Sequence, residues 1–220
     1  MTIQKSTIKV DANGKAANAY RAVPENGGPG VLVLHAWWGL KPYFKQVCDQ
    51  LAEQGFTALA PDLYQGRIAK TVDEARALLG QRDLELMDDT VKAAIDYLTF
   101  LNSGKAIGVV GFSMGASQAL DMAANGPDVT AVVLFYGSGG VDFKQVKAKV
   151  LGHYAEVDEW EPLEEIKAME NDMKSAGIDT RFYFYPKVGH WFVEADVPEY
   201  DPEAATLAWE RTFAFLKKNL

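Results

Sequence analysis

Two kinds of segment follow one another along this chain. Short, nearly uninterrupted apolar runs bounded by turn-forming residues predict buried strands, and they cover residues 30–36, 57–61, 106–113, 130–137, 149–155 and 180–186. Segments with apolar residues every three or four positions predict helices, and they cover residues 42–54, 71–101, 114–126, 162–177 and 203–218. Strands that alternate with helices indicate an α/β fold: a mostly parallel, twisted sheet with helices on both faces.

Turn-forming residues refine this pattern. Asn13-Gly14 interrupts an alternating segment and predicts a hairpin, because both residues tolerate the positive φ of a tight turn. Pro42 and Gly55 mark the two ends of the first helix, and Gly80 divides the segment 71–101 into two helices. No repeat, low-complexity tract or linker divides the chain, so we expect one domain spanning residues 1–220.

Composition and charge exclude several classes of function. The 22 Lys and Arg residues are outnumbered by 30 Asp and Glu, and the resulting net charge of −8 disfavours nucleic acid or an anionic membrane as partner. No apolar run approaches the ~20 residues of a membrane span, and the N-terminal residues lack the apolar region of a signal peptide. The lone Cys48 lies on the apolar side of a predicted helix, where a core position is expected. These features predict a cytoplasmic protein.

The strongest candidate for catalysis is Ser113. The segment Gly111-Phe112-Ser113-Met114-Gly115 matches the pattern G-x-S-x-G and lies between a predicted strand and a predicted helix. In such a turn the glycines leave room for neighbouring backbone, and the serine hydroxyl projects at the N-terminus of the helix. The alternative is a tight glycine-rich turn in which the serine only caps the helix. The flanking strand and helix favour a catalytic serine.

A serine hydroxyl needs a base to accept its proton, and the chain has three histidines. His190 follows the last predicted strand in a loop, the expected place for a base. His153 lies within a predicted strand, where packing is the simpler interpretation. His35 precedes Ser113 in the chain, which is the wrong order for the α/β-hydrolase arrangement, and is expected to brace a loop.

The third member of a triad should be an acid that orients the histidine. Three carboxylates, Glu156, Asp158 and Glu159, follow the strand predicted at 149–155. Asp158 is preferred because α/β-hydrolases place this acid after the second strand that follows the nucleophile, and the order nucleophile, acid, histidine agrees; Glu156 is the alternative. The remaining acids are explained as a solvated turn.

Several longer segments carry a more specific resemblance. They read LVLHAWWGLKPYFKQVCDQLAEQGFTALAPDLYQGR, GVVGFSMGA, HYAEVDEWEP and YPKVGHWF. In this order, over about residues 28 to 218, the chain resembles the dienelactone hydrolase family. The resemblance implies a compact α/β-hydrolase fold without a large lid, a monomer, and hydrolysis of small esters or lactones. No metal or organic cofactor is expected, since the three histidines share no metal-ligand spacing with cysteines or acids.

Two positions depart from the pattern of the best-known family members. Those members have a cysteine nucleophile and a supporting glutamate, whereas this chain has Ser113 and Ala36 at the matching positions. We interpret the pair as a plain Ser-His-Asp hydrolase, since a serine is deprotonated only during attack. Glu194 stands four residues after His190, where the family has an arginine that holds a substrate carboxylate. A carboxylate there disfavours anionic substrates, so a neutral or less anionic ester is expected.

The remaining site residues complete the predicted mechanism, which is acyl transfer through an acyl-enzyme. The backbone N–H groups of Met114 and Trp37 are expected to form the oxyanion hole. Trp37, Tyr136 and Trp191, which follow predicted strands, are the candidates for substrate binding, whereas Trp38 is expected to pack. The alternatives are a thioesterase with the same machinery and a non-catalytic binding or regulatory protein that kept the fold.

Overall fold

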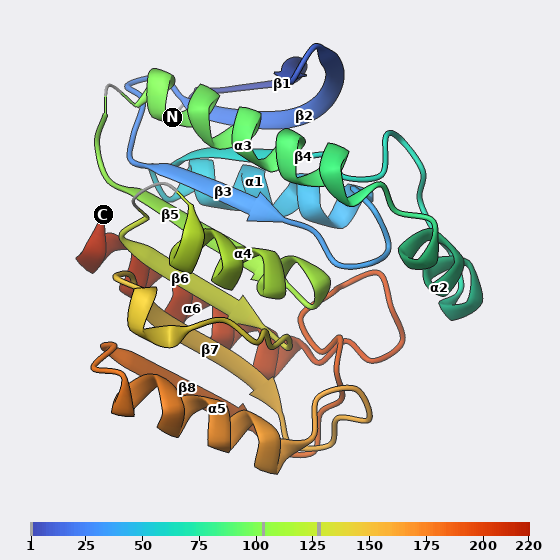
Figure 1. The fold of residues 1–220 in the computed structure, drawn as a ribbon, viewed down its shortest axis with the longest axis vertical. Helices are drawn as coiled ribbons and strands as arrows, with labels where there is room; N and C mark the ends of the chain where they lie inside the picture. The colour runs from blue at the N-terminus through green and yellow to red at the C-terminus, as the bar shows by residue number, and fades with distance from the viewer. Residues whose placement is uncertain (1, 103, 127–128) are drawn as a thin grey trace. The chain divides into compact units, whose positions relative to one another are not determined.

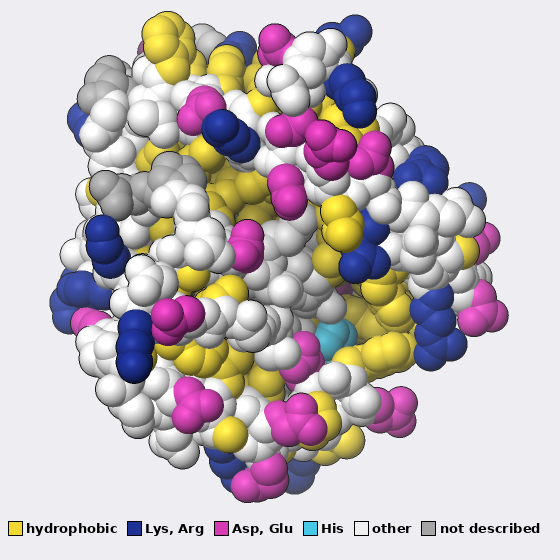
Figure 2. Space-filling view, in the orientation of Figure 1, with side chains coloured by type: hydrophobic (Ala, Val, Ile, Leu, Met, Phe, Trp, Pro, Cys, Tyr) yellow, Lys and Arg dark blue, Asp and Glu magenta, His cyan; other side chains and the backbone are white. Residues whose placement is uncertain are grey.

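The computed structural model describes residues 2–102, 104–126 and 129–220 (Figure 1). It separates into two compact units, Met1–Ile107 and Gly108–Leu220. Among the described residues, no helix combines the length and apolarity needed to cross a bilayer. On the face shown in Figure 2, acidic and basic side chains are interspersed and no extended basic patch is present.

The first unit contains a hairpin and a pair of buried parallel strands. Its described strands and helices are β1 (Ile3–Ala12), β2 (Lys15–Pro24), β3 (Gly30–Leu34), β4 (Thr57–Pro61), α1 (Pro42–Glu53), α2 (Val72–Gly80) and α3 (Leu84–Leu101). The strand order is β1-β2-β4-β3, in which β2 is antiparallel to β1 and β4, while β3 and β4 are parallel.

Local sequence signals explain the boundaries in this unit. Asn13 and Gly14 have φ values of 53° and 81°, which confirms the predicted hairpin turn. Gly55 follows α1 with a φ of 94°, a conformation that favours glycine. Thr71 caps α2 and Asp83 caps α3 by accepting hydrogen bonds from backbone N–H groups, so the segment 71–101 forms two helices as predicted. The side chain of Cys48 is fully buried in α1, as expected.

The second unit is a parallel sheet between helices. Its described strands and helices are β5 (Ile107–Phe112), β6 (Ala131–Phe135), β7 (Lys149–Ala155), β8 (Thr180–Tyr185), α4 (Met114–Asn125), α5 (Leu163–Ser175) and α6 (Pro202–Asn219). The strands lie in the order β5-β6-β7-β8 and all neighbours are parallel. In Figure 1, α4 and α5 lie on one face of these strands and α6 on the other.

The predicted strands and helices of this unit are present, with ends that differ by one or two residues. A short 3-10 helix, η1 (Phe143–Gln145), was not predicted from the sequence. Strands β5 and β6 are buried along their whole length, which explains their unbroken apolar runs. Because parallel strands end at the same edge of a sheet, the residues that follow β5, β6, β7 and β8 are brought together at one edge. Ser113, Glu156, Asp158 and His190 all follow these strands.

Candidate active site

Ser113 occupies the turn between β5 and α4. Its φ of 49° is uncommon for a residue with a side chain and marks a strained backbone. The turn is held at both ends, because the Ser113 N–H donates to the Phe135 carbonyl at 2.9 Å and the Ser113 carbonyl accepts from the Ala116 N–H at 2.8 Å. A Cβ at Gly111 would lie 2.3 Å from the Gly115 carbonyl oxygen, which accounts for glycine in the motif.

Gly137 also leaves room for this turn, although sequence reasoning did not select it. A Cβ at Gly137 would lie 2.4 Å from the Ser113 carbonyl oxygen and 2.7 Å from the Ala116 Cβ. The loop after β6 therefore packs directly on the turn that carries Ser113. In the sequence, Gly137 is one of three glycines between residues 137 and 140, and nothing local distinguishes it from the others.

Gly137→Ala is expected to strain the turn that carries Ser113. Contacts this short must be relieved by backbone shifts, so we expect a loss of about 1–3 kcal/mol in the free energy of unfolding and a lower kcat for the ester hydrolysis that the sequence predicts. Urea unfolding and steady-state kinetics measure the two effects. Gly140→Ala is the matched control, because a Cβ there meets no heavy atom within 4 Å. Equal behaviour of the two variants would contradict the prediction.

His190 joins Ser113 to Asp158. Its Nε2 lies 3.2 Å from Ser113 Oγ, and its Nδ1 lies 2.8 Å from Asp158 Oδ2 and 3.0 Å from Oδ1. The His190 and Asp158 side chains are only 5% and 1% exposed. A carboxylate can only accept, so we assign the proton to Nδ1, which donates to Asp158 and leaves Nε2 free to accept the serine proton.

The structure brings Asp158, and not Glu156, against His190. Asp158 Oδ1 also accepts hydrogen bonds from the backbone N–H groups of Trp160, at 2.8 Å, and Glu161, at 3.0 Å. These donors hold the carboxylate in place and stabilise its charge. Glu156 is exposed, and its backbone N–H donates to the Tyr185 carbonyl. Of the two carboxylates that the sequence left open, Asp158 is the one placed to orient His190.

Glu161 is a second carboxylate near this cluster that sequence reasoning did not select. It accepts a hydrogen bond from the backbone N–H of Ser138 at 3.1 Å, so it ties the loop after β6 to the loop after β7. Burial is the largest cause of its raised pKa. Glu161 lies two residues beyond the acidic stretch 156–159, and nothing in the sequence distinguishes it from the other acidic residues there.

The other two histidines are buried and lie outside this cluster. His153 in β7 bonds through Nδ1 to the Tyr185 hydroxyl at 2.8 Å and through Nε2 to the Thr212 hydroxyl at 3.0 Å, and burial lowers its pKa to about 3. It is a packed histidine, as predicted. His35 accepts a hydrogen bond from the Leu63 N–H at 3.2 Å, and burial lowers its pKa. It braces the loop after β3 against the loop after β4.

Met114, Trp37 and Ala36 occupy the expected local positions. Met114 is the first residue of α4, directly after Ser113, so its N–H is at the N-terminus of a helix. Trp37 and Ala36 belong to the first unit and follow β3; the Trp37 side chain is 8% exposed and Ala36 is fully buried. Trp38 is 6% exposed and packs edge-on against Trp37.

Tyr136 and Trp191 both contact the imidazole of His190. The ring centroids of Tyr136 and His190 are 4.8 Å apart, and Trp191 packs edge-on against His190 at 5.3 Å. Tyr136 is fully buried and has a φ of 38°, and its hydroxyl donates to Glu194 Oε1 at 2.7 Å. Glu194 is itself fully buried. Trp191 is 7% exposed and also contacts Trp160.

Among the described residues, no three His, Cys, Asp or Glu side chains lie close enough together to bind a metal ion. What the structure assembles is a serine on a strained strand-to-helix turn, a histidine and an aspartate, all on loops at one edge of a parallel sheet. This combination of fold and residues defines an α/β hydrolase.

Comparison with known proteins narrows the class. The sequence model of the dienelactone hydrolase family matches residues 17–220, and the chain belongs to that family. It is a hydrolase of the dienelactone hydrolase type, and the α/β-hydrolase fold expected from the sequence is confirmed.

The relatives are similar over nearly their whole length. Protein usf of Aquifex pyrophilus is 34% identical, with 97% of this chain and 98% of that protein covered. A protein of Aquifex aeolicus named "putative carboxymethylenebutenolidase" is 31% identical over the same shares. The crystal structure of a "putative dienelactone hydrolase" from Klebsiella pneumoniae superposes with a TM-score of 0.86, covering 99% of this chain and 100% of that one at 24% identity, which supports the shared fold.

Proposed function

We propose that this protein hydrolyses small carboxylic esters or lactones through a Ser113–His190–Asp158 triad and an acyl-enzyme. The observation that carries the proposal is the continuous chain of contacts from Ser113 Oγ to His190 Nε2, at 3.2 Å, and from His190 Nδ1 to Asp158 Oδ2, at 2.8 Å. Family membership supports the reaction class, and the burial of His190 and Asp158 supports their pairing.

The proposed reaction has two half-reactions. Ser113 Oγ attacks the carbonyl carbon of the substrate while His190 Nε2 takes the hydroxyl proton. The protonated histidine then gives this proton to the departing alkoxide, which leaves an ester between the acyl group and Ser113. Water attacks this ester with His190 again acting as base, and the acid is released. Asp158 keeps Nδ1 protonated and stabilises the imidazolium throughout.

The oxyanion of each tetrahedral intermediate needs hydrogen-bond donors. We assign the backbone N–H groups of Met114 and Trp37 to this role. Met114 is the first residue of α4, so the partial positive charge of the helix N-terminus favours a developing negative charge. A single donor of this kind is typically worth about 10²–10³ in kcat.

The choice of serine is consistent with Ala36. A carboxylate at this fully buried position would be costly unless it were paired, and a serine nucleophile does not require one. We therefore propose that Ser113 acts without the supporting carboxylate that a cysteine nucleophile would use at position 36.

We propose that neutral esters are preferred over anionic ones. Glu194 occupies the place of the family arginine, is fully buried, and accepts a hydrogen bond from Tyr136, whose ring contacts His190. A carboxylate in this setting offers no bidentate clamp for a substrate carboxylate. Trp37 and Trp191 are proposed to bind the substrate, whereas the full burial of Tyr136 favours a role in supporting the imidazole.

Kinetics with matched substrates tests the substrate proposal. We expect kcat/KM for p-nitrophenyl acetate to exceed that for dienelactone by at least about tenfold. The difference corresponds to one charge-assisted hydrogen bond, which the carboxylate of dienelactone cannot form with Glu194. A preference for dienelactone would contradict the role given to Glu194. A clear preference for p-nitrothiophenyl acetate would favour a thioesterase instead, and turnover of none of the three would contradict the hydrolase proposal.

The cellular setting follows from the same features. The single Cys48 is fully buried and not part of a disulfide, and burial raises the pKa of its thiol, so it is protected from oxidation. We propose that the protein acts as a monomer in the cytoplasm on a small-molecule substrate and without a cofactor. Its net charge of −8 supports a partner other than nucleic acid or an anionic membrane.

A further inference from the structure

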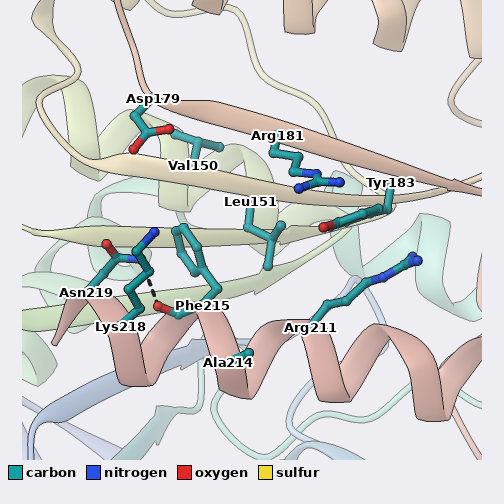
Figure 3. A pocket seen from close by; sticks show the side chains of 10 residues that line it. All are labelled: Val150, Leu151, Asp179, Arg181, Tyr183, Arg211, Ala214, Phe215, Lys218 and Asn219. Atoms are coloured by element: carbon teal, nitrogen blue, oxygen red, sulfur yellow. Dashed lines mark hydrogen bonds between the residues drawn. The ribbon is translucent and has the colours of Figure 1, made fainter.

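A groove of about 370 Å³ lies between β8 and α6 in the second unit (Figure 3). It is lined by Val150, Leu151, Asp179, Arg181, Tyr183, Arg211, Ala214, Phe215, Lys218 and Asn219. Val150 and Asp179 lie at or before the amino ends of β7 and β8, whereas the triad residues follow the carboxyl ends of strands. The groove is therefore separate from the proposed active site, and its volume falls in the range of small-molecule sites.

Two arginines stack on one tyrosine at this groove. The guanidinium carbon of Arg181 lies 4.6 Å from the centroid of the Tyr183 ring, and that of Arg211 lies 3.8 Å from it. Arg211 also donates from Nη1 to the Tyr185 hydroxyl at 3.1 Å. Arg181, Tyr183 and Tyr185 alternate along β8 and so share the face of the strand that α6 covers. These contacts orient both guanidinium groups before any ligand binds.

The basic side chains of the groove are not held in ion pairs by the described residues. Across the residues that the structure describes, no ion pair with Asp or Glu involves Arg181, Arg211 or Lys218. The one carboxylate in the lining, Asp179, pairs with Lys149 at 3.8 Å. In a chain with a net charge of −8, three such cations at one groove form an electropositive site.

The arrangement of charge along the groove limits the ligand. Lys218 lies seven residues, or about 10 Å, beyond Arg211 on α6, near the end of the groove where Asp179 stands. A second acidic group at that end would meet the Asp179 carboxylate as well as the Lys218 ammonium, whereas no carboxylate in the lining stands beside Arg181 and Arg211. Between the two ends the lining is apolar, with Leu151 and Phe215 on facing elements. This suits one acidic head group joined to an apolar body.

We propose that the groove between β8 and α6 binds a small organic anion, with a carboxylate or phosphate head group on Arg181 and Arg211 and an apolar body along Leu151 and Phe215. The fork of donors on each guanidinium matches two oxygens of either head group. The edges of stacked guanidinium groups remain available for such bonds, and only Nη1 of Arg211 is already used.

A titration followed by NMR tests the proposal. With ¹⁵N-labelled protein we expect saturable binding of hexanoate or hexyl phosphate, with shifts of the backbone amides of Arg181, Tyr183 and Arg211, and at least tenfold weaker binding of the neutral hexanamide. Arg181→Gln should weaken binding of the anions at least tenfold and leave kcat/KM for p-nitrophenyl acetate unchanged. The Arg181 side chain is exposed and forms no hydrogen bond or ion pair with the rest of the described chain, so this variant should fold.

Arg76→Gln is the matched control, because Arg76 is an exposed arginine on α2, outside the groove. It should bind the anions with the affinity of the unmodified protein. Stronger binding of hexyl phosphate than of hexanoate would identify phosphate as the head group, and the reverse order a carboxylate. Equal binding of hexanamide, unchanged affinity in Arg181→Gln, or no saturable binding of either anion at about 10 mM would overturn the proposal.

Discussion

Ser113→Ala is expected to lower kcat for p-nitrophenyl acetate by roughly 10⁴–10⁶-fold. The variant keeps the loop positions of His190 and Asp158 but removes the oxygen that attacks the carbonyl carbon. What remains is the contribution of the oxyanion hole and of substrate binding. Steady-state kinetics on purified protein measures the loss.

Two controls separate chemistry from folding in this experiment. Ser113 has a φ of 49°, so Ser113→Gly removes the hydroxyl while relieving the strain of the turn, and it should be as inactive as Ser113→Ala. Ser117→Ala changes an exposed serine one turn further along α4 and should keep full activity. Turnover by both Ser113 variants at the rate of the unmodified protein would show that the ester is hydrolysed elsewhere, and would contradict the proposed triad.

Asp158→Asn should have the next largest effect, a loss of roughly 10⁴-fold in kcat. The Asp158 carboxylate accepts from His190 Nδ1 and from two backbone N–H groups, so an asparagine at this position would present an amide N–H₂ to at least one donor. The imidazole would then be held in the wrong tautomer or orientation, with Nε2 unable to accept the serine proton. The KM for the ester should change far less than kcat.

Glu156→Gln is the matched control for this variant. It makes the same carboxylate-to-amide change two residues earlier, at an exposed side chain that does not contact His190. Full activity is expected. Near-normal kcat in Asp158→Asn together with a large loss in Glu156→Gln would reverse the assignment of the acid, and thermal unfolding of both proteins would show whether either loss comes from instability.

The sheet positions explain why the groove between β8 and α6 and the triad can act independently. The triad lies on loops that follow the carboxyl ends of the strands, whereas the groove is lined by residues within or just before β7 and β8 and by α6, and it includes no triad residue. Ligand binding in the groove is therefore proposed to leave the geometry of Ser113, His190 and Asp158 unchanged.

Local sequence signals were sufficient for most of the fold. The apolar runs identified the buried strands because a strand in a covered parallel sheet has no polar face, as in β5 and β6. Turn residues such as Asn13-Gly14 acted through their own backbone preferences, and the serine of G-x-S-x-G is defined by its immediate neighbours. The short 3-10 helix at Phe143–Gln145 was missed because so short a segment shows no periodicity.

The sequence by itself determined the order of strands and helices, the turn that carries Ser113 and the two loops that carry His190 and Asp158. Only the tertiary structure decided which carboxylate of an acidic loop meets His190, why Gly137 must lack a side chain, and how Tyr136 reaches Glu194. The physical reason is distance along the chain. Periodicity and turn preferences act over a few residues, whereas these contacts join loops 24 to 58 residues apart that meet because parallel strands end at one edge.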